Sequence, residues 1–261
     1  MTFKMKYPIK KKYLTKGTKR RSGIKMPKVG FIVAHDTGND GSTALQNIKY
    51  YENSNNVMSA SAHIFVDDIG IYECIPLLTD TPEKAWHVLY QKPLDNQIFG
   101  DDANDIAAGV ELCFSHKRGS INNEEAYKRY VWVIAYICHK FGLDPAKAII
   151  GHHILDPQRK TDPQNALSKM GKSYDQLLQD VVKEYYDCLP REELILKLKK
   201  WQIEMAHQSI ENLNEKELLH DVDEWKKKVE DKPDEVLKDI PWLFFVMLDR
   251  LSENKKLEGG I

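Results

Sequence analysis

The sequence predicts an α/β protein in which helices pack on a central mixed β-sheet, followed by a small helical domain. Three observations lead to this prediction. Short apolar runs of strand length alternate with helical patterns over residues 1–189. One of those helical patterns is long and clearly amphipathic. After Leu189-Pro190, apolar residues recur almost only at helical spacing. We therefore predict two domains, at residues 1–189 and 190–261.

Apolar runs predict the strands of the sheet: residues 29–34, 63–66, 71–75, 107–114 and 148–151. The polar segment at residues 67–70 joins two of these runs and predicts a hairpin turn. His35 and Asp36 follow the first run directly, and His152 follows the last. Polar residues just beyond buried strands are where α/β proteins often place their chemistry.

Helical patterns lie between these runs. The clearest spans residues 122–142, where apolar side chains at three- and four-residue spacing form one stripe. Asparagines at its start are candidate caps, and Gly142 suits its end. Weaker patterns predict helices near residues 42–51 and 174–186. Residues 90–105 are polar and contain Gly, Pro, Asn and Asp, so they are predicted to form a loop.

The C-terminal domain is predicted to be a small helical bundle. Its apolar side chains fall on three segments: Trp201, Met205 and Ile210, then Trp225 and Val229, then residues 242–248. This part of the chain is slightly acidic, with 13 basic and 17 acidic residues after position 190.

Positive charge is concentrated near the N-terminus. Between Lys4 and Lys28 there are eleven Lys or Arg residues and no acidic residue, although the net charge of the chain is −1. Two interpretations stay open. The basic arm would contact an anionic polymer such as teichoic acid or nucleic acid, or it would be a solvated segment before the first strand.

The sequence lacks a stretch of about 18 apolar residues that would predict a membrane span. Its N-terminus continues into lysines and has no apolar signal-peptide core. We therefore expect synthesis in the cytoplasm, no Sec-type export signal and no membrane insertion. The cysteines at positions 74, 113, 138 and 188 are widely spaced and are expected to be reduced, mostly buried thiols.

The densest group of chemically useful side chains is the predicted Pro-containing loop at residues 152–163, which holds two histidines and Asp162. His35 would add a further nitrogen from another strand end. Two histidines and one carboxylate are ligands typical of a catalytic zinc site, which keeps a fourth position open for water. The residues alone leave an alternative, in which His35 is a hydrogen-bonded core histidine and Asp162 an ordinary turn residue.

Five segments occur in an order that resembles a known family: Ala34–Asn39, Ser61–Asp67, Ala85–His87, Gly109–Leu112 and Gly151–Pro163. The family is that of the zinc-dependent N-acetylmuramoyl-L-alanine amidases related to phage endolysins, muropeptide-recycling amidases and peptidoglycan recognition proteins. The resemblance covers roughly residues 25–188 and implies the amidase fold. With its helical tail, the whole chain is similar to a phage or prophage endolysin of Gram-positive hosts.

The resemblance implies one zinc ion per chain, held by His35, His152 and Asp162. It also implies an enzyme that cleaves the amide between N-acetylmuramic acid and the L-alanine of the stem peptide. Zinc would activate the attacking water. Glu111 would take the proton of that water and return it to the alanine amine, and Lys160 would stabilise the developing oxyanion.

Three further residues are expected near the substrate. His87 resembles the family's substrate-contacting histidine, His63 matches a histidine beside the cleft, and Asn39 is placed along the groove. Some family members have a catalytic tyrosine just before the position of His63. This chain has Ala62 there, so that contribution is expected to be absent.

The resemblance also implies partners and a place of action. The substrate would be peptidoglycan, and the C-terminal domain would bind a cell-wall polymer or support self-association. Without an export signal, the protein would stay in the host cytoplasm until a separate membrane-permeabilising protein, a holin, releases it to the wall.

Two other functions compete with the amidase interpretation. A peptidoglycan-binding protein without catalysis would not need the complete set of ligands together with Glu111 and Lys160. A nucleic-acid-binding protein with a structural zinc would need a closed site with four ligands, and the sequence matches only three. We therefore expect no nucleic-acid partner.

Overall fold

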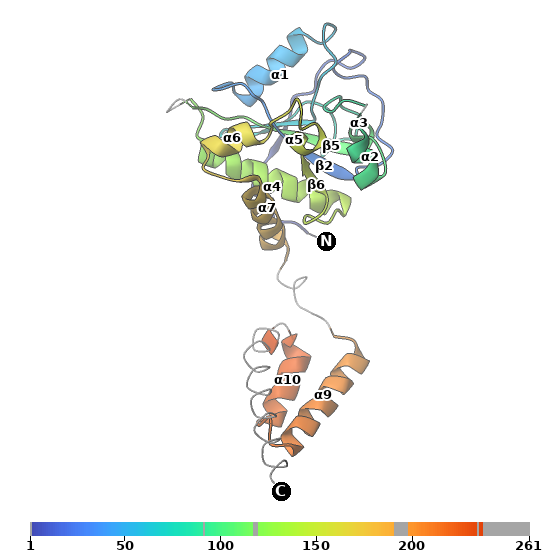
Figure 1. Ribbon diagram of the computed structural model, residues 1–261, viewed down its shortest axis with the longest axis vertical. Coiled ribbons are helices and arrows are strands. Elements are labelled where there is room, and N and C mark those ends of the chain that lie inside the picture. Colours follow the sequence, from blue (N-terminus) through green and yellow to red (C-terminus); the bar gives the residue numbers. More distant parts are fainter. Residues whose placement is uncertain (1, 91, 117–119, 191–197, 234, 237–261) are drawn as a thin grey trace. The chain divides into compact units, whose positions relative to one another are not determined.

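The chain divides into two compact units, Met1–Leu189 and Pro190–Ile261, and each is described by itself. The structure is a computed structural model and describes residues 2–90, 92–116, 120–190, 198–233 and 235–236 (Figure 1).

A six-stranded sheet forms the centre of the first unit, in the order β1-β4-β3-β5-β2-β6. β3 and β4 pair in antiparallel fashion, and the other neighbours pair in parallel. The mixed sheet that the sequence predicts is therefore confirmed. The strands are β1 Ile9–Lys11, β2 Phe31–Asp36, β3 Ile64–Val66, β4 Ile71–Glu73, β5 Ala107–Leu112 and β6 Ile149–Gly151.

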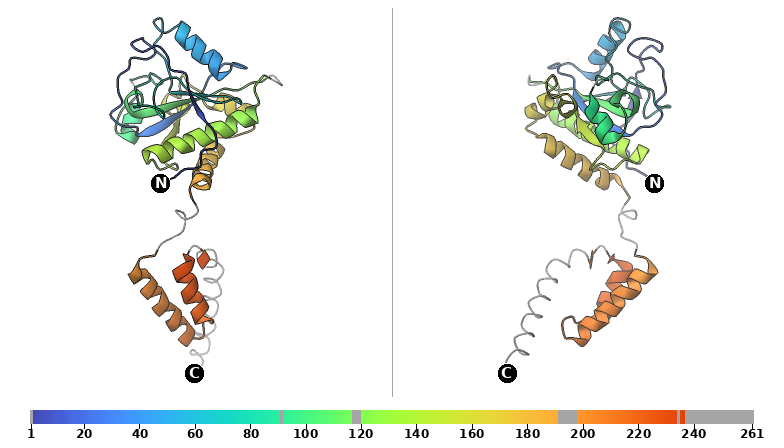
Figure 2. Two further views of the ribbon diagram at one scale, coloured as in Figure 1. Left: turned by 180° about the vertical axis from the view of Figure 1, so that it is seen from behind. Right: turned by 45° about the vertical axis from the view of Figure 1, so that its right-hand side comes forward.

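Helices pack on this sheet (Figures 1 and 2). Those of the first unit are α1 Ala44–Asn53, α2 Pro93–Phe99, α3 Ala103–Ile106, α4 Asn123–Phe141, α5 His152–Leu155, α6 Gln164–Lys169 and α7 Tyr174–Cys188. The long helix α4 matches its prediction. The Asn122 side chain accepts a hydrogen bond from the Glu125 amide at its start, and Gly142 ends it in the left-handed conformation, with φ 66°.

Alternate residues of β2 face two different hydrophobic clusters. Ile32 and Ala34 belong to the large cluster that includes side chains of α4 and α7. Phe31 and Val33 belong to a smaller cluster with α3 and α5. Because side chains along a strand alternate between the two faces of the sheet, His35 lies on the same face as Phe31 and Val33.

The prediction of a loop at residues 90–105 is wrong, because this segment contains α2 and most of α3. Pro93 opens α2, and Gly100 ends it in the left-handed conformation. The ring of Phe99 stacks on Phe31, with centroids 3.9 Å apart. The polar composition concealed these short helices, which are held by tertiary packing.

Two predicted boundaries also differ from the structure. β2 continues through His35 and Asp36, so these residues end the strand and do not begin a turn. The segment after β6 does not begin as a loop, because α5 starts at His152. In both places backbone pairing or helix formation extends into polar residues whose side chains face the site.

The basic N-terminal arm is part of the fold. It supplies β1, which pairs with β4, so the predicted first strand is the second in the structure. Arg20 is buried, and its guanidinium lies 4.0 Å from the ring centroid of Tyr51. The Arg21 side chain donates to Glu83 at 2.8 Å. These two arginines stabilise the first unit and are not a solvated segment.

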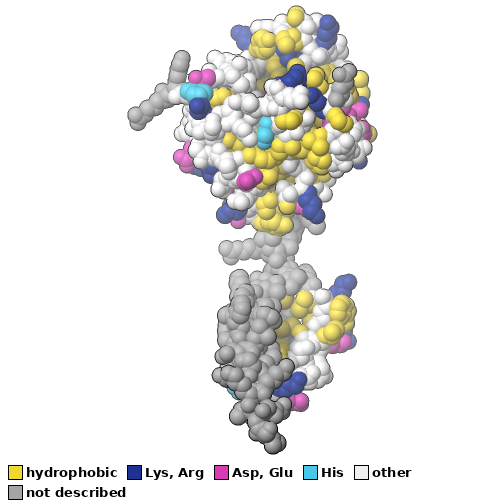
Figure 3. Space-filling model, viewed as in Figure 1, with side chains coloured by type: hydrophobic (Ala, Val, Ile, Leu, Met, Phe, Trp, Pro, Cys, Tyr) yellow, Lys and Arg dark blue, Asp and Glu magenta, His cyan; other side chains and the backbone are white. Residues whose placement is uncertain are grey.

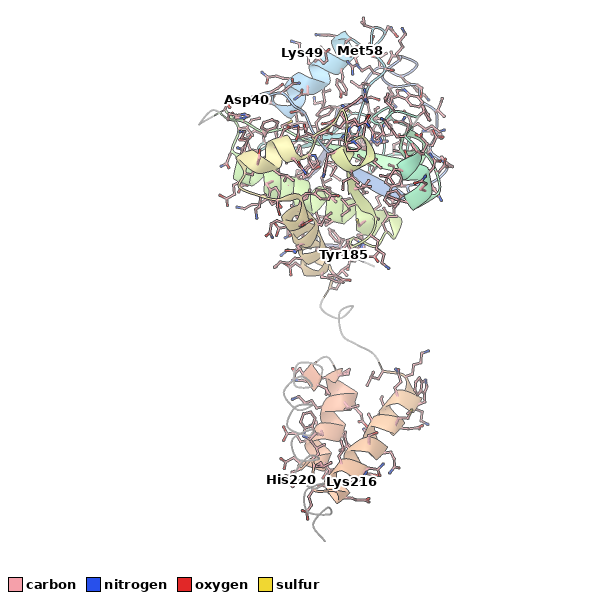
Figure 4. The ribbon with its side chains drawn as sticks, viewed as in Figure 1. Asp40, Lys49, Met58, Tyr185, Lys216 and His220 are labelled. Carbon is pink, nitrogen blue, oxygen red and sulfur yellow. The ribbon has the colours of Figure 1, made fainter. Side chains whose placement is uncertain are left out.

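Helices α9 Lys200–Glu215 and α10 Val222–Asp231 make up much of the described part of the second unit. They pack through Ile210, Leu219 and Val229, with Trp225 against them. Figure 4 labels Lys216 and His220 in the connection between the two helices. The third helical segment predicted at residues 242–248 lies outside the described residues.

The face of the first unit drawn in Figure 3 mixes Lys and Arg with Asp and Glu side chains. The four cysteines are free and buried, as predicted. Within the described residues, no helix combines the length and the apolar composition that a membrane crossing requires.

We expect residues 1–189 to fold without the rest of the chain, because the first unit has its own sheet and its own hydrophobic clusters. The melting temperature of this fragment should lie within about 4 °C of the first unit's transition in the full chain, which corresponds to about 1 kcal/mol at this size. Calorimetry of the two proteins measures this. A fragment that binds a hydrophobic dye and lacks a cooperative transition would contradict the two-unit division.

Candidate metal centre

The parallel pairing of β2 and β5 brings the first two site residues together. In the register of these strands, His35 lies directly beside Glu111. Paired residues on neighbouring strands point to the same face, so both side chains leave the sheet on one side. The Tyr130 hydroxyl on α4 donates to the His35 carbonyl at 3.0 Å and supports this end of β2 from the opposite face.

The chain returns to the same place after β6. His152 is the first residue of α5, and the following segment leads back to Asp162. The His153 amide donates to the Asp162 carbonyl at 3.0 Å, which ties the two ends of this segment together. The Asp36 carboxylate accepts hydrogen bonds from the Ala166 amide at 3.1 Å and from Asn165 at 3.2 Å. Asp162 is therefore anchored on both sides.

Three candidate ligands converge at this point. Asp162 Oδ2 lies 2.8 Å from His35 Nδ1 and 3.0 Å from His152 Nδ1. All three residues are buried, and one ligand atom from each lies within 4.8 Å of the others. The structure thus brings together the complete ligand set that the sequence predicts.

The chemistry of these groups fits a divalent cation. Burial lowers the pKa of His35 to about 4, so its ring is neutral at pH 7, which is the form that binds metals. Burial alone would raise the pKa of Asp162, but its close contacts with His152 and His35 hold that pKa well below its usual value. His152 Nε2 is buried and has no hydrogen-bond partner. A carboxylate and two imidazoles leave room for further ligands, as in catalytic zinc sites.

Glu111 stands beside this cluster with one oxygen unused. Its Oε2 is buried and has no hydrogen-bond partner. Burial, together with the charges of Asp162 and Asp36, raises the pKa of Glu111 well above its usual value, while Lys160 acts in the opposite direction. A carboxylate that is left unpaired in such a place is costly for folding alone and suits proton transfer.

The cluster opens into a pocket of about 370 Å³. Its lining includes the three candidate ligands together with Glu111, Lys160 and His87. A neighbouring groove of about 520 Å³ shares Trp86, His87, His152, Arg159 and Lys160 with it. The two hollows therefore form one continuous surface that is larger than the metal centre itself.

Two residues predicted near the substrate do not line the pocket. His63 is fully buried, with its Nε2 2.8 Å from the Glu83 carbonyl oxygen, and its ring centroid lies 5.8 Å from that of the pocket-lining His87. Its contact with the substrate stays a prediction. Asn39 is exposed and donates to Asn47 at 3.1 Å, and it is also absent from the pocket lining. Their positions in the sequence say nothing of the direction in which their side chains point.

The structure adds residues to the site that sequence reasoning missed. Tyr51, from the last turn of α1, lines the pocket together with Glu111. No motif singles out a tyrosine within a helical pattern. Arg159 lies within the segment Gly151–Pro163, but its position in the sequence alone predicts no role. Its guanidinium donates to the fully buried Asp156 at 2.7 Å, a contact that only the structure reveals.

Comparisons with known proteins agree with this geometry. The family described as N-acetylmuramoyl-L-alanine amidase matches residues 25–165, which is more than half of the chain. The N-acetylmuramoyl-L-alanine amidase BlyA of Bacillus subtilis strain 168 is 33% identical over 163 residues. This match covers 59% of the present chain and 42% of BlyA, so the chain spans less than half the length of that relative.

Solved structures share the fold of the first unit. The catalytic domain of XlyA superposes with a TM-score of 0.52 at 21% identity and covers 67% of this chain and 99% of that domain. The Staphylococcus aureus hydrolase AmiA, solved in complex with its ligand, gives 0.53 at 25% identity and covers 69% of this chain and 85% of AmiA.

We expect Asp162→Ala to lose affinity for a divalent cation by more than about 100-fold, beyond the 10–100-fold typical of groups that only support a ligand. The reason is that Asp162 Oδ2 is the atom that both histidines face. Competition with a chromophoric chelator measures the affinity.

His153→Gln is the matched control, because the His153 ring faces the Asp162 carbonyl and not its carboxylate. This variant should keep its cation. Full binding by Asp162→Ala, combined with loss in His153→Gln, would overturn the ligand assignment.

Proposed function

The chain belongs to the N-acetylmuramoyl-L-alanine amidase family, and on this premise we propose that it hydrolyses the amide between N-acetylmuramic acid and L-alanine in bacterial peptidoglycan. The observation that carries the proposal is the convergence of His35, His152 and Asp162 beside Glu111, inside the segment that the family matches. The similarity to BlyA, an N-acetylmuramoyl-L-alanine amidase, supports the same bond.

The cation of the site is zinc, one per chain. His35, His152 and Asp162 would hold it, since two imidazoles and one carboxylate are a common catalytic zinc set. When bound, zinc polarises the amide carbonyl and makes water a nucleophile at neutral pH. The convergence of His35 Nδ1 and His152 Nδ1 on Asp162 Oδ2 supports a cation at this point.

Glu111 acts as the general base and then as the general acid. It takes a proton from the attacking water and transfers it to the leaving alanine amine. Its free Oε2 supplies the position for this proton, and because burial raises its pKa, the ionised carboxylate is a stronger base than a solvated one. The register of β2 and β5 holds it beside His35, so the proton acceptor and the cation site face the same pocket.

Lys160 stabilises the negative charge that develops on the amide oxygen. Its side chain lines both hollows of the site. It follows Arg159 on the segment that returns to Asp162, so a positive charge stands at the rim next to the candidate cation. A fixed cation near a developing oxyanion is among the strongest contributions to amide hydrolysis.

The surface beyond the metal centre suits a substrate with a sugar on one side and a peptide on the other. The pocket and the adjoining groove share part of their lining, including Trp86 and Arg159. An aromatic ring packs against a sugar face, whereas a guanidinium pairs with a peptide carboxylate. Two such different side chains along one surface match this mixed polymer.

The rival functions have less support. A purely binding protein leaves the unpaired Glu111 oxygen without a purpose. A nucleic-acid module would depend on the basic arm, but Arg20 is buried and Arg21 pairs with Glu83. The arm therefore offers less free positive charge than its composition suggests.

The bond cleaved is tested by mass spectrometry of peptidoglycan digested with the protein. We expect stem peptides with a free N-terminal L-alanine and glycan strands without peptides. Glu111→Gln should lower the rate about 10²–10⁴-fold, because it removes the acid/base group and leaves the shape of the site.

Zinc content and thermal unfolding of Glu111→Gln serve as controls, and both should match the wild type. Products cut at a glycosidic or a peptide–peptide bond would refute the proposed activity. Rapid turnover by a zinc-loaded Glu111→Gln would remove only the assigned role of Glu111.

The second unit is proposed to bind the cell wall or to support self-association. Its exposed Trp201 and Met205 offer apolar contacts. The protein would act from outside the membrane after a holin releases it from the host cytoplasm.

We expect residues 1–189 to cleave soluble muropeptides as fast as the full chain but to lyse intact walls more slowly. Because the second unit is slightly acidic, its wall affinity should come from specific contacts and survive moderate salt. Sedimentation of both proteins with purified walls, and their oligomer sizes in solution, measure this. Equal wall binding and equal oligomer size would contradict both roles.

A further inference from the structure

His87 lies behind the metal centre, with both of its ring nitrogens occupied. Its Nδ1 is 3.1 Å from His35 Nε2, and its Nε2 is 3.2 Å from the Ala107 carbonyl oxygen. The residue is only 8% exposed. No ring nitrogen is left for the substrate, so the contact expected from the family resemblance does not describe what this ring does here.

His87 belongs to a row of three polar contacts, and the number of N–H hydrogens available to these contacts is limited. The row runs from the Ala107 carbonyl through His87 and His35 to Asp162, and it contains three gaps between heavy atoms. Two neutral imidazoles carry two N–H hydrogens. Only two of the three gaps can therefore hold a hydrogen bond, and the remaining gap brings two acceptors face to face.

The buried end of the row decides which gap lacks a proton. The Ala107 carbonyl can only accept, so His87 Nε2 must be the nitrogen that carries the proton. His87 Nδ1 is then an acceptor for a proton on His35 Nε2. In this tautomer the lone pair of His35 Nδ1 is directed at Asp162 Oδ2, 2.8 Å away. A cation held by these two atoms stabilises this tautomer, whereas a proton on His35 Nδ1 would leave two unprotonated nitrogens facing each other between His35 and His87.

The opposite tautomers of both rings place the two facing acceptors at the Ala107 end of the row, where no cation can enter. If His35 Nδ1 carried the proton, His87 Nδ1 would have to donate, and His87 Nε2 would face the Ala107 carbonyl without a hydrogen. That end is closed by the sheet, whereas the Asp162 end lines the open pocket. The hydrogen-bond partners of His87 include no carboxylate, so none of its polar contacts favours a charged ring over a neutral one.

We propose that His87 is a positioning residue that selects the tautomer of His35, so that the His35 Nδ1 lone pair faces the cation. The inference depends on the zinc site of the proposed function. Ligand histidines usually donate their second ring nitrogen to a carbonyl or a carboxylate. Here a second imidazole, that of His87, stands between the ligand His35 and the Ala107 carbonyl. The carbonyl accepts the proton of His87 Nε2, and His87 Nδ1 then accepts the proton of His35 Nε2.

Gly109 makes this arrangement possible. A Cβ built at this position would lie 2.9 Å from His87 Cγ and 3.1 Å from its Nδ1. The His87 ring therefore rests directly on the backbone of β5, two residues before Glu111. Any side chain at position 109 has to push the ring away from His35, which offers a way to disturb the row without removing a polar group.

The experiment compares variants that keep or lose the acceptor. His87→Leu removes both nitrogens at similar volume, and His87→Asn keeps an acceptor oxygen near the Nδ1 position. Gly109→Ala displaces the ring. Val88→Ala is the matched control, because Val88 is a buried neighbour of His87 and this substitution removes only apolar packing. The readouts are zinc affinity by chelator competition, thermal unfolding of the metal-free proteins, and nitrogen-15 NMR of the histidine rings.

We expect His87→Leu and Gly109→Ala to bind zinc about 10–100-fold more weakly than the wild type, with most of the affinity recovered in His87→Asn. Val88→Ala should lose stability but no affinity. In the wild type, with and without zinc, NMR should find the protons of His35 and His87 on Nε2. In His87→Leu, metal-free His35 should populate both tautomers.

Two results would overturn the proposal. One is zinc affinity in His87→Leu equal to that of the wild type. The other is wild-type His35 with its proton on Nδ1. If His87→Leu does not fold, the comparison of His87→Asn with Gly109→Ala decides, since both should fold but only the second should lose affinity. A wild type that binds no zinc would refute the proposed metal site, while the NMR of metal-free protein would still test the row.

Discussion

The in-register parallel pairing of β2 and β5 is the constraint on which the rest of the site depends. It places His35 next to Glu111 and, two residues earlier, Val33 next to Gly109. One pairing therefore sets the distance from the candidate ligand to the carboxylate that we propose transfers the proton, and it also opens the space in which the His87 ring lies. Because side chains alternate along a strand, a shift of one residue would turn Glu111 into the opposite hydrophobic cluster.

Long-range closure completes the centre. Asp162 is 127 residues from His35, yet its carboxylate meets both histidines. The loop is held by groups that do not bind the cation. The His153 amide fixes the Asp162 carbonyl, and Asp36, at the end of β2, fixes the start of α6. Strand and loop are thus joined through hydrogen bonds on either side of the ligand, so the three donors are preorganised before a cation arrives.

Burial gives these groups their reactivity. Water is largely excluded from His35, His152 and Asp162, which keeps the imidazole of His35 neutral and leaves the charge of the carboxylate dependent on its contacts with the two histidines. Two of the buried side-chain atoms that have no hydrogen-bond partner, His152 Nε2 and Glu111 Oε2, belong to residues that line the same pocket. Unsatisfied polar atoms cost folding free energy, and residues that carry them are often found in functional sites.

The sequence by itself determined the mixed α/β class, most of the strands, α4 with its caps, and the identities of the three ligand candidates, because periodicity, capping residues and motif order are local properties of the chain. It did not reveal β1, α2 or α3, whose short polar segments are held by packing partners such as Phe31. Nor could it tell that His63 is buried, or that Tyr51 joins the pocket from a helix. Only the tertiary structure decided the role of His87, because a hydrogen bond between side chains 52 residues apart depends on how strands and loops meet in space, and spacing along the chain does not record it.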